Sequence, residues 1–285
     1  MTNSLQKKII LITGANAGIG KETTRALAKS GARIIMACRN LKKSTITQQE
    51  IIEESKNYNI QLIHLDLASI ASIRMFTDKI HDQFSHIDIL INNAGIFNMK
   101  RELTADGFEA TMGVNCLGTF LLTDLLLPGL LKSKNSRIIN VASDAHYNGS
   151  IDLDNFHFDK KYSGFKAYAS SRLATVLYTQ ELAERLKDHN ITVNSLHPGH
   201  VYTNIWNLWP KRKLLNMIMD NIMKRVAISA VEGAKTSIYL ASSDQVAGIS
   251  GKYFDKLQIK APSKKCQDKD FQKALWDFSS KEVGL

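Results

Sequence analysis

Short apolar runs rich in β-branched residues alternate with helical patterns from residue 8 to about residue 196. The first run covers residues 8–13, and a helical pattern over residues 21–30 follows it and ends at Gly31. Such runs are typical of strands that are buried on both faces, and parallel strands need a crossover connection between them. The alternation therefore predicts an α/β fold with one doubly wound parallel sheet and helices on both faces.

The same reading assigns the rest of the chain to a single domain spanning residues 1–285. Further strands are expected at residues 33–38, 60–65, 87–91, 136–141, 191–196 and 251–254. Further helices are expected at residues 41–56, 70–84, 103–131, 165–187 and 231–242. Near the C-terminus, apolar residues at helical spacing predict a helix at about 268–279 that docks on the body of the domain.

A glycine-rich turn separates the first strand from the first helix. It reads Gly14-Ala15-Asn16-Ala17-Gly18-Ile19-Gly20. Glycines let the backbone approach a pyrophosphate, and a helix N-terminus offers free N–H groups and the positive end of its dipole. The turn therefore predicts a Rossmann dinucleotide site that includes Gly14, Asn16, Gly18, Ile19 and Gly20, with an ordinary turn as the alternative.

Arg39 follows the second strand, where the adenosine ribose of a dinucleotide would lie. An acidic residue there would hold the free 2′-hydroxyl of NAD, whereas an arginine suits the 2′-phosphate of NADP. Arg39 thus favours NADP(H) over NAD(H). Lys21 is expected either to add charge to this site or to be a solvated helix residue.

Polar and small residues also follow the third and fourth strands. Asp66-Leu67 is expected at the cofactor, where Asp66 bonds the adenine amine or caps the next helix. Asn92-Asn93-Ala94-Gly95 lets the backbone pass close to a cofactor ribose, or it is a plain turn.

Tyr168 and Arg172 are four residues apart, so on a helix they share one face. A neighbouring positive charge favours the phenolate form of a tyrosine, and a solvated helix face is the alternative. Ser143 follows a strand at the edge where open α/β sheets bind ligands. The adjacent Asp144 and His146 raise a Ser/His/Asp hydrolase as another reading, but no Gly-x-Ser-x-Gly turn is present.

Together these motifs resemble those of the short-chain dehydrogenases/reductases, and the resemblance covers nearly the whole chain. It rests on Thr13-Gly14-x-x-x-Gly18-Ile19-Gly20, Asn92-Asn93-Ala94-Gly95, Asn115, Ser143, Tyr168 and Pro198-Gly199. The retinol dehydrogenase branch, with its retinal reductases and WW-domain oxidoreductases, is similar in further segments. These are Gly14-Ala15-Asn16, Lys21-Glu22-Thr23, Ala37-Cys38-Arg39, Leu173-Ala174, Glu181-Leu182 and Gly251-Lys252-Tyr253-Phe254.

The resemblance implies an oxidoreductase that transfers a hydride between a nicotinamide cofactor and a carbonyl or alcohol. Tyr168 would be the general acid/base, and Ser143 would hydrogen-bond the substrate oxygen. Asn115 would support a water relay; from the residues alone it is either that or a satisfied core residue. Thr203 would touch the nicotinamide end. The remaining cofactor contacts implied are Asp66, Leu67, Asn92, Ala94, Gly95, Tyr168, Arg172, Pro198, Gly199 and Val201.

Arg172 departs from the family pattern, which has lysine four residues after the tyrosine. Arginine keeps the positive charge but effectively never loses its proton, so a relay through it would weaken. Three outcomes are open: an active reductase, a slow one, or a catalytically impaired NADP(H)-binding interaction protein. We favour the active but slower reductase.

Residues 203–226 interrupt the alternation and are rich in Trp, Leu, Ile and Met. The resemblance implies a lid over a hydrophobic substrate here, such as a retinoid or lipid aldehyde; simple core packing is the alternative. Lys211-Arg212-Lys213 and Lys224-Arg225 flank the apolar stretch, which would also suit peripheral contact with an acidic membrane surface.

Composition limits the partners and the cellular compartment that the sequence can predict. The formal net charge of +10 fits an anionic cofactor, and no nucleic-acid motif is present. Three cysteines without paired spacing predict neither a disulfide nor a metal framework and favour a reducing, cytoplasmic compartment. We find no signal-peptide pattern and no apolar run of about 18–20 residues that would predict a membrane span. A homodimer is common in the resembling family.

Overall fold

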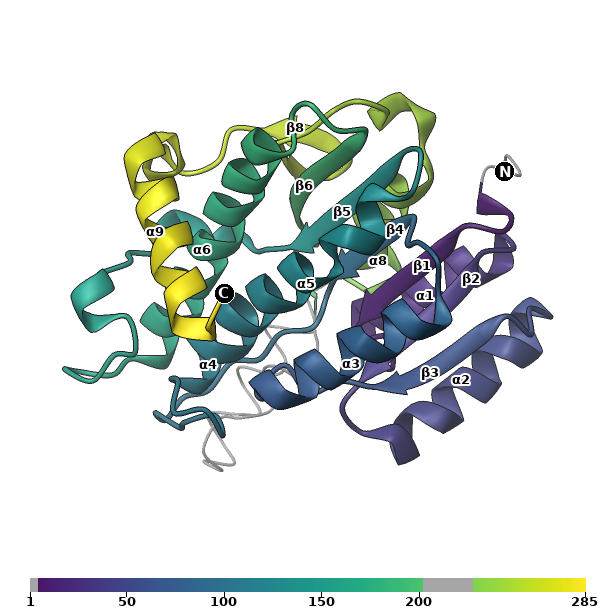
Figure 1. Cartoon of the computed structure of the whole chain (residues 1–285), viewed down its shortest axis with the longest axis horizontal. Helices are drawn as coiled ribbons and strands as arrows, with labels where there is room; N and C mark the ends of the chain where they lie inside the picture. The colour runs from purple at the N-terminus through teal and green to yellow at the C-terminus, as the bar shows by residue number, and fades with distance from the viewer. Residues whose placement is uncertain (1–4, 202–227) are drawn as a thin grey trace.

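The computed structural model describes residues 5–201 and 228–285, so Thr203 and the lid expected at 203–226 lie outside the described residues. One eight-stranded sheet runs through the molecule in the order β3-β2-β1-β4-β5-β6-β7-β8 (Figure 1). Its strands are β1 (Ile9–Thr13), β2 (Arg33–Cys38), β3 (Ile60–His64), β4 (Ile89–Asn92), β5 (Ser136–Val141), β6 (Ile191–His197), β7 (Tyr253–Asp255) and β8 (Gln258–Lys260).

The predicted doubly wound sheet is confirmed for β1 to β7, which pair in parallel throughout. The strand order reverses between β1 and β4, the switch point where doubly wound folds bind ligands beyond the carboxyl ends of the strands. The sequence analysis missed β8, a three-residue edge strand with exposed side chains that pairs antiparallel with β7. So short and exposed a strand lacks the apolar run on which the prediction relied.

Two layers of helices cover the sheet, as Figure 1 shows with α3, α5, α6 and α9 on the near face. The core against that face is built from apolar side chains of those four helices, and the opposite core from those of α1, α2 and α8. The helix bounds are α1 (Gly18–Lys29), α2 (Leu41–Ser55), α3 (Ile70–Gln83), α4 (Ala110–Met112), α5 (Thr119–Leu131), α6 (Gly164–Arg185), α8 (Ala230–Ser242) and α9 (Lys269–Val283).

The helix expected from residue 103 begins only at Ala110. The preceding residues form a tight turn, in which Gly107 has a φ of +86° and Leu103 bridges to Glu109. Asp106-Gly107 is a turn signal that the apolar pattern obscured. Glu109 then caps α4 by accepting hydrogen bonds from the main-chain N–H groups of Thr111 and Met112.

From Ala110 to Leu131 the chain is helical over 22 residues, with a π-helical segment at Gly113–Gly118 between α4 and α5. By length and composition this stretch could cross a membrane, with a mean hydropathy of 1.6 in its most apolar window. However, 67% of that window is buried inside the molecule, as in the core helix of a globular domain.

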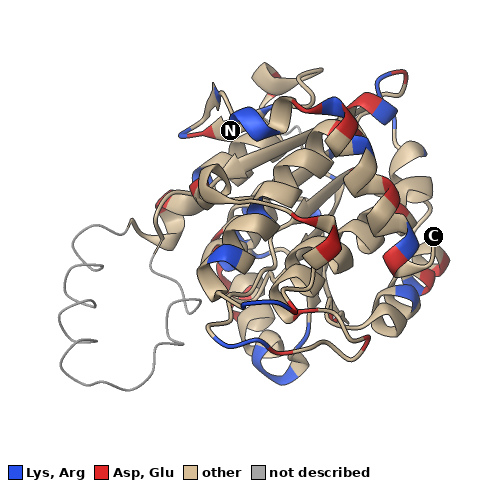
Figure 2. Cartoon of the chain, turned by 90° about the vertical axis from the view of Figure 1, so that its left-hand side faces the viewer, with Lys and Arg blue, Asp and Glu red and all other residues tan. Residues whose placement is uncertain are grey.

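Helix α9 corresponds to the C-terminal helix expected at about 268–279. It packs along α6 and α5 through Leu275 and Trp276, and the Trp276 ring lies 4.7 Å from that of Phe120. The three cysteines are free and buried. In Figure 2 the positions of Lys and Arg alternate with those of Asp and Glu along the described chain in view.

The start of β1 is fixed by a buried carboxylate. Asp88 accepts hydrogen bonds of 2.8 Å from Lys8 Nζ, the main-chain N–H of Ile9 and the Ser133 hydroxyl. Burial alone would raise the pKa of Asp88, but these donors outweigh it and hold the pKa below its ordinary value.

We expect Asp88→Asn to lower the free energy of unfolding by about 1–3 kcal/mol at pH 7, because a buried charged acceptor is lost. Since the folded-state pKa lies below the unfolded value of about 3.9, this stabilisation is present above that pH and is lost as the pH falls through the folded-state pKa. Urea unfolding of the wild type and the variant at pH 7 and pH 3 measures the loss of unfolding free energy at each pH. The exposed Asp78→Asn is the control, and an equal destabilisation at both pH values would contradict the assignment.

Candidate active site

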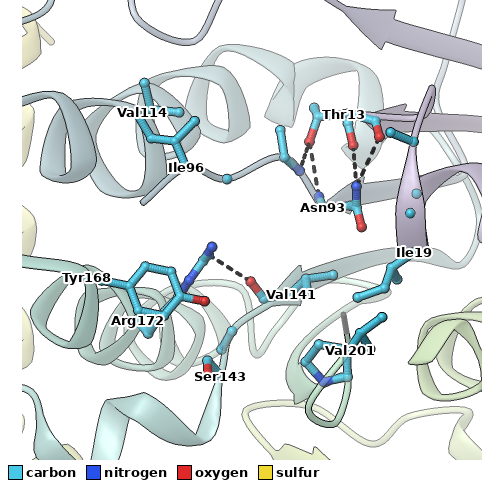
Figure 3. A pocket seen from close by; sticks show the side chains of 18 of the residues that line it. Thr13, Ile19, Asn93, Ile96, Val114, Val141, Ser143, Tyr168, Arg172 and Val201 are labelled. Atoms are coloured by element: carbon cyan, nitrogen blue, oxygen red, sulfur yellow. Dashed lines mark hydrogen bonds between the residues drawn. The ribbon is translucent and has the colours of Figure 1, made fainter. Parts of the chain in front are cut away.

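A cavity of about 760 Å³ opens beyond the carboxyl ends of the strands, over the switch point between β1 and β4. In Figure 3 Tyr168, Arg172 and Ser143 lie on one side of this pocket, and Thr13 and Asn93 lie across from them. Of the expected site residues, the lining contains Gly14, Asn16, Gly18, Ile19, Gly20, Arg39, Asp66, Leu67, Ala94, Gly95, Ser143, Tyr168, Arg172, Pro198, Gly199 and Val201.

The glycine-rich turn forms the floor beside the N-terminus of α1. Gly14 and Gly18 have positive φ angles of +64° and +52°, a region that favours glycine. A Cβ on Gly20 would collide with the carbonyl oxygen of Gly14, so the turn can close only with glycine there. The glycines therefore leave the main chain of this turn open to the pocket, without side chains in between.

The N-terminus of α1 is suited to an anion. Its N-cap is Ala17, which supplies no side-chain hydrogen bond, whereas α2, α3, α8 and α9 are capped by Asn40, Ser69, Ser229 and Asp268. The first-turn N–H groups of α1 are thus left without a side-chain acceptor, and no acidic residue lies in its first turn. This geometry fits the pyrophosphate of a dinucleotide.

Two cations line the pocket near the end of β2. Arg39 is exposed and forms no hydrogen bond or ion pair with another described residue, and Lys43 lies on the first turn of α2. Lys21, in contrast, is outside the lining and pairs with Glu50 at 2.7 Å. The sequence analysis missed Lys43, although its spacing of four residues from Arg39 was a signal.

Asp66 lines the pocket but does not cap α3, so that alternative reading is wrong. Ser69 is the N-cap and accepts a hydrogen bond from the N–H of Ser72. Asp66 instead accepts a bond from the N–H of Ala68, an Asx turn that holds the loop after β3.

Asn92 lies behind the pocket and is absent from its lining. Its amide donates to Thr123 Oγ1 at 2.9 Å and to Asn140 Oδ1 at 2.8 Å, deep between β4, β5 and α5. Because successive strand side chains point to opposite faces, the neighbouring Asn93 faces the pocket in its place, and its N–H bonds the Thr13 hydroxyl.

Asn115 lies on the π-helical segment and is also outside the main lining. It accepts from the N–H of Ile96 at 2.8 Å, and it donates to the Ile96 carbonyl and to Ser171 Oγ. Asn115 is thus a satisfied residue that fixes the loop carrying Gly95. It also borders a separate cavity of about 30 Å³, which is large enough for an ordered water.

Tyr168 and Arg172 lie one turn apart on α6, as their spacing predicts. The guanidinium carbon of Arg172 is 4.9 Å from the centroid of the Tyr168 ring, and Arg172 Nη1 donates to the Val141 carbonyl at 3.1 Å. Arg172 is 5% exposed, and its Nε has no partner among the described residues. A Cβ on Gly95 would collide with Arg172 Nη2, so the glycine makes room for the guanidinium.

The Tyr168 hydroxyl forms no hydrogen bond with another described residue, and the edge of its ring packs against Phe97 at 5.6 Å. Ser143 Oγ accepts from the N–H of Ala145 and donates to Asp144 Oδ1, both at 3.2 Å. Ser143 and Tyr168 both line the pocket, and Figure 3 shows their side chains on the same side of it.

His146 does not act on Ser143 Oγ, which rules against the hydrolase reading. Its Nδ1 donates to the Ser143 carbonyl at 2.7 Å, and its Nε2 accepts from the N–H of Ser263 at 3.1 Å. Burial lowers the pKa of His146, which keeps the ring neutral. His146 is thus a structural residue that ties the loop after β5 to the C-terminal segment.

The segment after β6 completes the wall. Gly199 turns the chain with a φ of +85°, and Gly233 on α8 allows Val201 to approach, because a Cβ there would collide with Val201. The lining also contains residues that the sequence analysis did not assign to it, among them Thr13, Lys43, Ile96, Val114, Asp144 and His197.

Comparisons with known proteins agree with this geometry. The sequence matches the family described as short chain dehydrogenase over residues 8–213. Human retinol dehydrogenase 13 is 43% identical over 98% of this chain and 85% of its own length, and human retinol dehydrogenase 14 is 40% identical over 98% and 87%.

Solved structures are similar as well. A crystal structure of an uncharacterised protein from Mycobacterium paratuberculosis has a TM-score of 0.80 and 32% identity, covering 99% of this chain and 95% of that one. A structure described as a short chain dehydrogenase from Escherichia coli CFT073 complexed with NADPH has a TM-score of 0.71 and 25% identity, covering 90% and 100%. The protein therefore belongs to the short chain dehydrogenase family of oxidoreductases, in the branch of the retinol dehydrogenases.

Proposed function

We propose that this protein is an NADP(H)-dependent oxidoreductase that interconverts a hydrophobic carbonyl compound and its alcohol, such as a retinoid or a lipid aldehyde. The observation that carries the proposal is the Tyr168 hydroxyl, which faces the pocket without a partner among the described residues and lies next to the Arg172 guanidinium. The bound nicotinamide would supply or accept the hydride.

The residues of the chain manage the proton and the substrate oxygen. During reduction Tyr168 donates its hydroxyl proton to the carbonyl oxygen, and the Ser143 hydroxyl hydrogen-bonds that oxygen. Arg172 places a fixed positive charge beside Tyr168, which favours the phenolate left after the transfer. Asn115 positions the Gly95 loop through Ile96.

A hydrophobic substrate is supported by apolar residues in the pocket lining, among them Ile96, Val114 and Phe165. The related human proteins are named for retinol, a bulky apolar alcohol. The lid expected at 203–226 stays a prediction that rests on the family resemblance, and its Trp- and Met-rich sequence would suit an adaptable apolar surface.

The preference for NADP(H) is supported by Arg39 and Lys43, which line the pocket where β2 ends. We expect Arg39→Asp to weaken NADPH binding about 100-fold while weakening NADH binding less than threefold, because a charge-assisted bond to the 2′-phosphate becomes a repulsion. Fluorescence titrations with both cofactors measure this. Lys42→Asp makes the same charge change at an exposed neighbour outside the lining and is the control. Equal losses of affinity for NADPH and NADH would contradict the assignment of Arg39 to the 2′-phosphate.

Turnover itself is tested by following NADPH oxidation with all-trans-retinal and a series of medium-chain aldehydes. We expect reduction of at least the longer and more apolar substrates. Binding of NADPH without reduction of any carbonyl in the panel would instead support the impaired-binding reading of Arg172.

Localisation and assembly remain predictions from the sequence. We propose a cytoplasmic protein, with peripheral membrane contact and a homodimer as arrangements to be tested, and no nucleic-acid partner. Vesicle co-sedimentation would measure the membrane contact, and light scattering would measure the oligomeric state.

A further inference from the structure

Two histidines and one aspartate meet at the rim of the pocket. Asp144 follows Ser143 in the loop after β5, His197 ends β6, and His200 lies three residues further on. One ligand atom from each of the three side chains lies within 4.8 Å of those from the other two. We propose that Asp144, His197 and His200 form a site for a divalent transition metal of the zinc class.

The fold brings these residues together although Asp144 and His197 are 53 positions apart. Strands β5 and β6 are parallel neighbours, so their carboxyl ends place the two following loops side by side. Gly199, at a φ of +85°, then turns the chain so that the His200 ring stands 5.4 Å from the His197 ring. No short sequence spacing signals such a site, because its ligands come from two separate loops.

The distances are close to those that a metal needs. Zinc bonds of about 2.0–2.1 Å in tetrahedral geometry put ligand atoms about 3.3 Å apart. Asp144 Oδ2 lies 3.1 Å from His200 Nε2 and 3.9 Å from His197 Nε2. The ligand atoms of the two histidines lie within 4.8 Å of each other, so zinc binding would draw His197 closer to the other two ligands. Asp144 Oδ1 is left to accept the hydrogen bond from Ser143, so coordination through Oδ2 leaves that contact intact.

The donor set selects the class of metal. Two imidazole nitrogens with one carboxylate oxygen suit zinc and its transition-metal neighbours, whereas magnesium and calcium prefer oxygen ligands. The side chains of His200 and Asp144 are 62% and 36% exposed, so an ion can enter from solvent.

Metal binding has one identifiable cost. His197 Nδ1 accepts a hydrogen bond of 3.2 Å from the N–H of Asp144, so without a metal the ring proton lies on Nε2. Coordination through Nε2 moves that proton to Nδ1 and breaks this bond. The exchange also leaves the Asp144 N–H facing the new Nδ1–H, so the metal–imidazole bond has to outweigh a lost hydrogen bond and an unpaired donor.

The test is zinc binding to the full-length, untagged protein after removal of metals with a chelator and dialysis. Isothermal titration with Zn²⁺ should show one site per chain, and Co²⁺ should give visible absorption bands typical of low coordination. We expect His200→Ala and Asp144→Ala each to weaken zinc binding about 100-fold or more, because each removes one of only three ligands.

His64→Ala, at an exposed histidine on the far strand β3, is the matched control and should leave binding unchanged. His200→Asn is a second variant that keeps a polar side chain at the rim, and it should lose zinc as His200→Ala does. The proposal is overturned if the wild-type protein binds no zinc, or if the His200 and Asp144 variants bind it as tightly as the wild type does. Because the readout is metal binding, it is independent of whether the proposed carbonyl reduction is correct.

Discussion

Replacing Tyr168 with phenylalanine is expected to lower kcat for carbonyl reduction by about 10²–10⁴-fold, the usual contribution of a general acid. The variant keeps the ring, its contact with Phe97 and the cation over its face, and it removes only the hydroxyl that faces the pocket. NADPH affinity should therefore change little. Initial rates of NADPH oxidation with all-trans-retinal, together with a fluorescence titration of NADPH, measure the two quantities.

Tyr58→Phe is the matched control, since Tyr58 is 80% exposed and is absent from the pocket lining. It should leave both kcat and NADPH affinity unchanged. A Tyr168→Phe protein that kept more than about a tenth of the wild-type kcat would show that another group donates the proton, because that loss is well below the general-acid range.

The fold could be predicted from the sequence because its signals are local. Each buried strand is a short apolar run, and each crossover helix has its own amphipathic pattern, as in β1 and α1. The glycine-rich turn could be assigned for the same reason, since Gly14, Gly18 and Gly20 are needed by the backbone itself. Edge strand β8 could not, because its side chains are all exposed.

The side chains of the site were harder to assign, since their directions depend on tertiary contacts. Asn92 and Asn93 are adjacent and chemically identical, yet only Asn93 faces the pocket. Asn115 follows no sequence pattern that reveals its hydrogen bonds to Ile96 and Ser171. Residues brought together from separate loops, such as Asp144 and His197, leave no trace in sequence spacing.

Arg172 is the residue on which the chemistry of this chain most depends. Its guanidinium is buried, is held by the Val141 carbonyl, and fills the space left by the missing side chain of Gly95. A buried cation without a carboxylate partner among the described residues is costly unless it serves a site. This position therefore argues for a functional positive charge beside Tyr168 rather than a chance replacement of lysine.

We accordingly expect Arg172→Met to lower kcat by about 100-fold or more, and Arg172→Lys to stay within about tenfold of the wild type, because only the lysine variant keeps the charge that favours the phenolate. Steady-state kinetics across pH measure both variants. Arg137→Met is the control: Arg137 is half-buried and donates to two carbonyls, those of Leu240 and Ser243, but it lies outside the pocket. It should reduce stability without reducing kcat.

A different result would change the interpretation of the native residue. If the wild type binds NADPH but reduces no carbonyl, and Arg172→Lys creates turnover, then arginine cannot pass the proton that lysine passes, since its guanidinium effectively never deprotonates. If Arg172→Met and Arg172→Lys lower kcat equally, the shape of the guanidinium and its hydrogen bond to the Val141 carbonyl matter more than the charge. If Arg172→Lys is nearly as active as the wild type, the positive charge beside Tyr168 is sufficient, and proton release does not pass through residue 172.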